Sequence, residues 1–242
     1  CMLGWRARIG IIVPATNTAT ESEFWKTLPE GVPLSFARAV SSRDSDQVRR
    51  LSAYKESALK GAIEVAEVQP DLIVWACTSG SFVNGVGYDR ALSAELERAV
   101  GIPVITTSSA LLAAINTLRV KRVALGTPYP QPITNIEARF LEDSVAGLKV
   151  VNTGIIDISD PYTRGLIRPE QAYELGKRID KSDAEAIILS CTDLQTFSII
   201  QELEADLGKP VISSNSATAW AMFRKLGIRP STQIGRLWAP RK

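Results

Sequence analysis

Two segments of the sequence recur 114 residues further along the chain, and this internal repeat limits the fold more than any other feature. Arg122–Pro128 repeats the basic start, the apolar run and the final proline of Arg8–Pro14. Glu185–Thr192 repeats Asp71–Thr78, with an acidic residue, an apolar run and Cys-Thr in the same order. The repeat predicts two halves with the same succession of structural elements.

A third segment extends the repeat and indicates that the second copy is shorter. Gly208–Val211 repeats Gly101–Val104 at an offset of 107 residues. We therefore expect one half formed by residues 1–110 together with about 217–242, and a second half formed by residues 111–216.

Short apolar runs in both halves have the length of buried parallel strands. We expect strands at Ile9–Pro14, Leu34–Ala37, Leu72–Ala76, Val104–Thr106, Val123–Gly126, Lys149–Val151, Ala186–Ser190 and Val211–Ser213. Helical spacing of apolar residues predicts helices at Ser45–Val68, Arg90–Val100, Ala110–Leu118, Pro132–Leu141, Pro169–Ile179, Leu194–Leu207 and Ala217–Leu226. This alternation predicts an α/β protein made of two flavodoxin-like halves. Each half would hold a parallel four-stranded sheet, with a pseudo-two-fold axis relating the halves and the active site between them.

The chain of 242 residues contains no histidine. Ser-His-Asp and Cys-His nucleophile pairs, HExxH zinc sites and two-His iron sites are therefore excluded. Proton transfer near neutral pH would have to use Cys, Asp, Glu, Lys, Tyr or water.

The net charge and the length of the apolar runs argue against a nucleic-acid or a membrane partner. The 28 basic and 26 acidic residues give a net charge of +2, so we expect no nucleic-acid partner. The apolar runs are far shorter than a membrane span of ~20 residues, and residues 1–8 hold no apolar stretch of signal-peptide length. Three cysteines do not suggest a disulfide framework. We expect a cytoplasmic protein without a membrane partner.

The repeat places Cys77 and Cys191 at equivalent strand ends, where open α/β sheets bind their ligands. Thr78 and Ser79 follow the first cysteine, and Thr192 follows the second. Backbone N–H groups at such turns hold carboxylate oxygens and favour a thiolate. The cysteines would then stand on opposite sides of one small substrate.

Other interpretations of these residues stay open. A strand-end cysteine is often a core residue, a disulfide switch would also use the pair, and two thiolates alone make a poor zinc site. Asn17 either caps the helix expected to start near Glu21 or donates to a substrate carboxylate. Tyr129, between two prolines, either packs in its loop or offers its hydroxyl as a donor.

Four motifs together resemble a known family. They are Val13-Pro-Ala-Thr-Asn-Thr18, Ala76-Cys-Thr-Ser-Gly-Ser-Phe82, Gly126-Thr-Pro-Tyr129 with Ile133-Thr134, and Ser190-Cys-Thr192. The chain resembles the Asp/Glu racemase superfamily over about residues 9–226, and the maleate cis–trans isomerase branch above all. It is also similar to arylmalonate decarboxylases and to isomerase-like proteins of ectoine breakdown.

The resemblance implies a cofactor-independent isomerase, without a metal, that acts on a small carboxylate. Cys77 would add as thiolate to an alkene carbon of maleate, and Cys191 would act as acid and base before fumarate leaves. Asn17 and Tyr129 match family residues that bind the substrate carboxylates. The resemblance also implies a homo-oligomer, either a dimer or a tetramer.

Two departures from the family pattern keep alternatives open. The loop after the strand near residue 150 lacks the family's asparagine, where Ser159 would donate instead, and Asp160 there would suit an ammonium group. Asp193 stands where racemases have a histidine. Arg164 and Arg168 either attract a carboxylate or lie on the surface. A two-thiol racemase or epimerase of an amino-acid-like carboxylate is the alternative, and a non-catalytic carboxylate-binding protein is a further one.

Overall fold

The computed structural model of the protein describes residues 4–42, 44, 46–158 and 160–239. A strand lies at each of the predicted positions. The strands are β1 (Ile9–Pro14), β2 (Leu34–Ala39), β3 (Leu72–Trp75), β4 (Val104–Thr106), β5 (Arg122–Thr127), β6 (Lys149–Ile155), β7 (Ala186–Leu189) and β8 (Val211–Ser213). They form two parallel sheets of orders β2-β1-β3-β4 and β6-β5-β7-β8, so the second sheet repeats the topology of the first. The predicted fold class is confirmed.

Helices connect the strands, as right-handed crossovers in parallel sheets require. They are α1 (Ala19–Trp25), α2 (Gln47–Ser52), α3 (Tyr54–Ala66), α4 (Ser79–Phe82), α5 (Tyr88–Val100), α6 (Thr107–Leu118), α7 (Gln131–Ser144), α8 (Pro169–Ile179), α9 (Ile200–Leu207) and α10 (Ser214–Leu226). Two short 3₁₀ turns, η1 (Arg164–Leu166) and η2 (Arg236–Trp238), complete the described structure.

The single helix predicted over residues 45–68 is two helices. The Asp46 side chain caps α2 by accepting from the backbone N–H of Arg49 at 2.9 Å, and α3 begins two residues after α2 ends. Arg50 and Leu51 of α2, together with Tyr54 at the start of α3, line one pocket of the molecule, while the rest of α3 packs against β1 and β2. Helical spacing alone cannot reveal such a break, because apolar residues continue through it.

The helix predicted at residues 194–207 begins only at Ile200. The preceding segment is a loop whose backbone bonds to the other half of the molecule. Glu23 of α1 accepts from the N–H groups of Thr196 and Phe197. Those N–H groups therefore bond to a carboxylate from a distant part of the chain and not to carbonyls of a helix of their own, so tertiary contact overrides local propensity.

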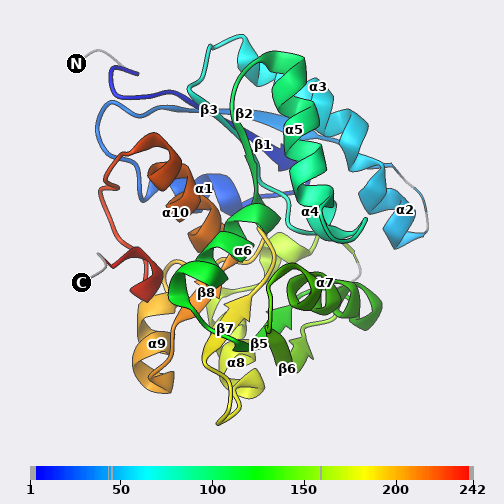
Figure 1. Cartoon of the computed structure of the whole chain (residues 1–242), viewed down its shortest axis with the longest axis vertical. Helices are drawn as coiled ribbons and strands as arrows, with labels where there is room; N and C mark the ends of the chain where they lie inside the picture. The colour runs from blue at the N-terminus through cyan, green and yellow to red at the C-terminus, as the bar shows by residue number, and fades with distance from the viewer. Residues whose placement is uncertain (1–3, 43, 45, 159, 240–242) are drawn as a thin grey trace.

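Helices α6 and α10 pack against each other in the middle of the molecule, between the two sheets (Figure 1). Each starts with the same capping box, formed by Thr106 and Ser109 in α6 and by Ser213 and Ser216 in α10. The capping boxes thus carry the sequence repeat into the structure. The predicted division of the chain into halves remains a prediction, and α6 runs across its expected boundary at residue 110.

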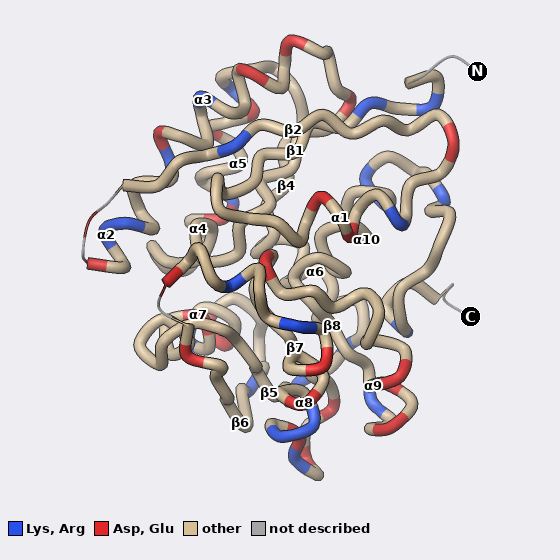
Figure 2. The backbone as a smooth tube through the Cα atoms, turned by 180° about the vertical axis from the view of Figure 1, so that it is seen from behind, with Lys and Arg blue, Asp and Glu red and all other residues tan. Residues whose placement is uncertain are grey.

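Lys and Arg alternate with Asp and Glu along the chain in both parts of the molecule, without separating into a basic and an acidic side in this view (Figure 2). No helix in the described part of the chain is long and apolar enough to cross a membrane. The inner strands β1, β3 and β7 are buried along their whole length, as expected for parallel sheets covered by helices, whereas the edge strands β2 and β6 are partly exposed.

Candidate active site

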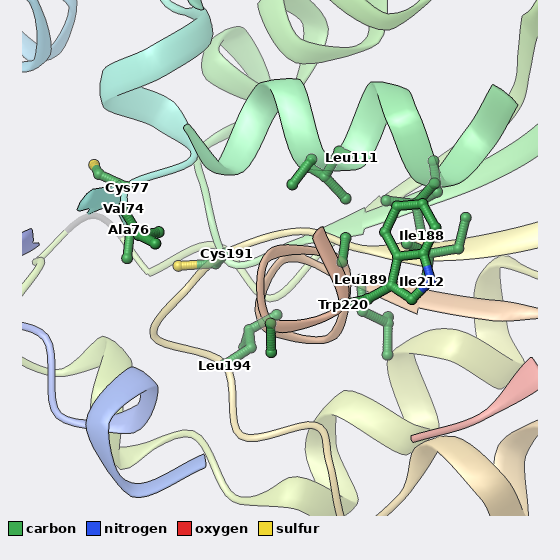
Figure 3. Packing of buried hydrophobic residues seen from close by; sticks show 14 of the residues in the cluster. Val74, Ala76, Cys77, Leu111, Ile188, Leu189, Cys191, Leu194, Ile212 and Trp220 are labelled. Carbon is green, nitrogen blue, oxygen red and sulfur yellow. The ribbon is translucent and has the colours of Figure 1, made fainter. Parts of the chain in front are cut away.

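Cys77 and Cys191 follow β3 and β7 and line one pocket, with about 500 Å³ of empty space including its mouth. Both side chains are buried, at 3% and 5% exposure. Figure 3 shows them at the same edge of the buried apolar cluster, with Leu189 and Leu111 deeper inside. Parallel strands that end at one edge of each sheet bring the two thiols together, as the repeat predicted.

The turn after Cys77 directs one backbone donor at the thiol. The N–H of Gly80 donates to the Cys77 Sγ at 3.4 Å. Burial nevertheless dominates and raises the pKa of Cys77 to about 12, while the Gly80 and Ser79 hydrogen bonds and the Arg164 charge lower it. The predicted N–H donor is present, but burial outweighs it, so the Cys77 thiol is protonated at neutral pH instead of being shifted toward the thiolate.

Cys191 has a matching environment. The N–H of Asp193 donates to its Sγ at 3.3 Å. Burial raises the pKa of Cys191 to about 11, and the Arg164 charge and a hydrogen bond with Tyr129 lower it. The Tyr129 hydroxyl therefore lies at the second thiol, on the side of the pocket formed by the second sheet.

Asn17 fulfils the capping role considered for it, and its amide also lies in the pocket. Its Oδ1 accepts from the N–H of Thr20 at 3.0 Å, which caps α1, and its Nδ2 donates to the Thr192 hydroxyl at 3.2 Å. The residue thus bridges the loops of the two sheets and lines the pocket. Its amide has donor capacity beyond the Thr192 bond, because the NH₂ group carries two hydrogens.

Thr78 and Ser79 also line the pocket, but they differ in what their hydroxyls do. The Thr78 hydroxyl donates to the Ser214 hydroxyl at 2.9 Å, so its contribution to a ligand would be its backbone. Ser79 instead hydrogen-bonds to the Cys77 thiol. The structure therefore brings together Asn17, Cys77, Thr78, Ser79, Tyr129, Cys191 and Thr192, all predicted from the sequence.

The loop after β6 departs from the predictions. Ser159 lies outside the described residues. Asp160 is exposed, accepts from the Tyr162 N–H at 3.0 Å and does not line the pocket. Arg168 is exposed as well. The reasoning that Asp160 would hold an ammonium group in the pocket is thus wrong, because its carboxylate turns onto its own loop.

Arg164 is the functional candidate that sequence reasoning left undecided. It is 7% exposed, and its guanidinium lies over the Tyr129 ring with 5.2 Å between the Cζ and the ring centroid. Its Nε donates to the Ile158 carbonyl at 3.2 Å. Two further pocket residues, Arg50 and Tyr54, had no sequence signal that separated them from an ordinary amphipathic helix.

The described residues contain no group of three His, Cys, Asp or Glu side chains that would hold a metal ion. The pocket offers two thiols, the Asn17 amide, two guanidinium groups and several hydroxyls around a small volume. Such a set suits covalent addition or proton transfer on a small anion.

The chain is similar to known enzymes over most of its length. A sequence model of the family described as "Arylmalonate decarboxylase" matches residues 9–238. The maleate isomerase of Alcaligenes faecalis is 30% identical over 237 residues, which is 91% of each chain. The arylmalonate decarboxylase of Bordetella bronchiseptica is 29% identical over 223 residues, or 90% of each chain. A variant of the maleate isomerase Iso from Pseudomonas putida, solved with maleate, has a TM-score of 0.86 at 26% identity over 96% of each chain.

Proposed function

Because this chain belongs to the arylmalonate decarboxylase family and is an isomerase like its maleate isomerase relatives, we propose that it converts maleate, or a close analogue, into the trans isomer without a cofactor. One observation carries the proposal: Cys77 and Cys191 line the same small pocket from two different sheets. One thiol can add to an alkene carbon while the other gives a proton to the neighbouring carbon.

The first step forms a covalent adduct. The Cys77 thiol first releases its proton to solvent. Its thiolate then adds to one alkene carbon of maleate, and the π electrons move toward the other carbon and its carboxylate. The Cys191 thiol gives its proton to that other carbon. The products of this step are an S-succinyl Cys77 and a Cys191 thiolate, so proton and charge balance.

The second step depends on rotation about the carbon–carbon bond that the first step converted from a double to a single bond. The former double bond is now single, and rotation about it is fast compared with rotation about an alkene. The Cys191 thiolate then removes a proton from the carbon that received one, the double bond re-forms, and the Cys77 thiolate leaves. The product is fumarate, and both sulfurs return to their starting protonation once Cys77 regains a proton from solvent.

The surroundings of the thiols fit the charge that develops on the substrate carboxylate. The Asn17 amide and the Tyr129 hydroxyl lie in the pocket as donors, and the guanidinium of Arg164 is close enough to lower the pKa of both cysteines. Donors already held in place stabilise an enolate without further reorganisation.

A racemase would use the same two thiols, but its amino-acid substrate would carry a positive charge that the pocket does not suit. An amino-acid substrate brings an ammonium group, and the only acidic side chain among the described pocket residues is Asp193. Asp193 already accepts from the N–H groups of Thr18 and Ala19, and Arg164 would repel the ammonium group. The isomerase proposal is therefore favoured.

Proton NMR of the purified protein with maleate in D2O tests the proposal. We expect the maleate signal to decrease and the fumarate signal to appear with the wild type, and Cys77→Ala to lose this activity completely. Cys191→Ala should be impaired. Solvent must then supply the proton that completes the Cys77 adduct, and the base that would eliminate Cys77 again is missing, so the adduct should accumulate and appear in intact-mass spectra about 116 Da heavier, the mass of one maleic acid. Unchanged maleate at high enzyme concentration would rule out this substrate, and Cα deuteration of an amino acid would favour the racemase.

Two broader expectations remain predictions. We propose that the protein is a homo-oligomer, dimer or tetramer, and that it works in the cytoplasm. Light scattering after size exclusion tests the first, and a result of one chain per particle would contradict it.

A further inference from the structure

Arg164 is a buried cation that forms no ion pair with a carboxylate of the described residues, although its charge lowers the pKa of the nearby Asp193. Its side chain is 93% buried, and its Nη2 has no hydrogen-bond partner among the described residues. Arg38, Arg49 and Arg122, by contrast, each pair with a carboxylate. A buried guanidinium with an unpaired donor lowers the stability of a fold. Its presence in the pocket therefore points to a ligand that pairs with it.

The position of the guanidinium indicates which ligand that is. Arg164 lines the pocket of the two cysteines, and its charge acts on both thiols. Tyr129 supports it from one side by a cation–π contact. The nearby Asp193 carboxylate is engaged by the N-terminus of α1. Because Arg164 lines the pocket, an anion that enters between the thiols would lie near its guanidinium, and a guanidinium binds a carboxylate well through paired N–H groups.

A second arginine reaches the same pocket from the other sheet. Arg50 of α2 is half-buried, lines the pocket and forms no ion pair within the described part of the chain. The charges of Arg50 and Arg164 both act on Tyr54. The pocket is thus lined by two cations from two different elements, against one acid that is already engaged.

We propose that Arg164 binds one carboxylate of the substrate and Arg50 attracts the other, so that the site selects small dicarboxylates over monoanions of the same size. This proposal rests on the proposed function for the reaction that the bound ligand undergoes. The preference for a doubly charged ligand does not depend on that reaction. Arg164 is the inner, fixed anchor because it is buried and held by Ile158 and Tyr129. Arg50 is the outer one, because it is only half-buried.

Binding of an unreactive pair of ligands tests this separately from catalysis. Succinate has two carboxylates and no double bond, and succinamate replaces one carboxylate by an uncharged amide of nearly the same size. By calorimetry we expect the wild type to bind succinate at least about tenfold more tightly than succinamate, as charge-assisted hydrogen bonds require. In Arg164→Gln this ratio should fall to within about threefold. Arg164→Lys should lie between the two, because lysine keeps the charge without the paired N–H groups.

Arg168→Gln is the matched control, since it removes an exposed arginine from the same segment. It should keep the wild-type ratio, and circular dichroism should show that all variants are folded. An unchanged ratio in Arg164→Gln, or equal affinity of the wild type for both ligands, would overturn the proposal. Succinate binding that depends on Arg164 in a protein that does not isomerise maleate would refute the proposed reaction alone. Maleate turnover by Arg164→Gln with the wild-type KM would refute the role of Arg164 alone.

Discussion

Asp193 accepts a hydrogen bond from the backbone N–H of Thr18, with 2.8 Å between the Asp193 Oδ1 and the Thr18 nitrogen. The same oxygen accepts from the N–H of Ala19 at 3.3 Å. A carboxylate in the Cys191 loop thus caps α1, which follows the first strand of the other sheet. Glu23 of α1 returns the contact by accepting from the Phe197 N–H at 2.7 Å. These reciprocal bonds hold the loops of the two sheets together at the site.

The reciprocal contacts predict a stability role for Asp193. Asp193→Ala should lower the free energy of unfolding by about 1–2 kcal/mol, the usual cost of losing a helix cap. Asp193→Asn should lose less, because an amide oxygen can still accept from Thr18. Urea unfolding followed by circular dichroism measures both variants. Equal stability of Asp193→Ala and the wild type would show that the cap contributes nothing.

The raised thiol pKa values predict the pH dependence of the reaction. Burial raises the pKa of Cys77 to about 12 and that of Cys191 to about 11, so the free enzyme holds little thiolate at neutral pH. Since kcat/KM reports the free enzyme, it should rise by about tenfold for each pH unit between pH 7 and 9. Initial rates at low maleate concentration measure this. A plateau below pH 8 would mean that a thiol of the free enzyme ionises in the neutral range.

Gly165 keeps Arg164 in place through close packing. A Cβ built at Gly165 would lie 2.1 Å from the Thr18 hydroxyl and 3.3 Å from the Asp193 Oδ1. Gly165→Ala should therefore displace the η1 turn, cost about 1–3 kcal/mol as overpacking does, and weaken succinate binding. Leu166→Ala, at the neighbouring and exposed position, is the control and should leave both quantities unchanged. Wild-type affinity in Gly165→Ala would show that the η1 turn tolerates the added methyl group.

The sequence was sufficient to predict the strands and the two cysteines that follow them. The strands and the positions of Cys77 and Cys191 follow from apolar runs and from the repeat, and the structure confirms the strands. Arg164 was not decided by the sequence, because an arginine in a loop is usually exposed and only the packing against Tyr129 buries it. The late start of α9 has a similar cause, since Glu23 binds the preceding loop from far away in the chain.

Glu137 allows a further prediction, about stability rather than catalysis. Its side chain is 1% exposed in α7, its Oε1 accepts from the Ser190 hydroxyl, and its Oε2 has no partner among the described residues. Burial raises the pKa of Glu137 from its ordinary value to about 8. The folded protein therefore keeps a proton on Glu137 that the unfolded chain has already released above about pH 4.5.

The sign of the effect follows from this difference. As pH rises from about 4.5 to 8, the unfolded state gains the free energy of ionising Glu137 and the folded state does not, so the wild type loses stability and then levels off. Glu137→Gln cannot ionise. The free energy of unfolding of this variant, relative to the wild type, should therefore increase over that range, by on the order of 4 kcal/mol at pH 8. Other buried carboxylates cancel in the comparison because both proteins contain them.

Urea unfolding at pH 5, 6, 7 and 8 measures the difference. Glu174→Gln, which removes an exposed carboxylate from α8, is the control, and its difference from the wild type should not change with pH. A difference for Glu137→Gln that is equally flat would mean that Glu137 is ionised in the folded protein throughout this range. The Ser190 hydroxyl, next to Cys191 in the chain, would then be hydrogen-bonded to a buried anion rather than to a neutral acid.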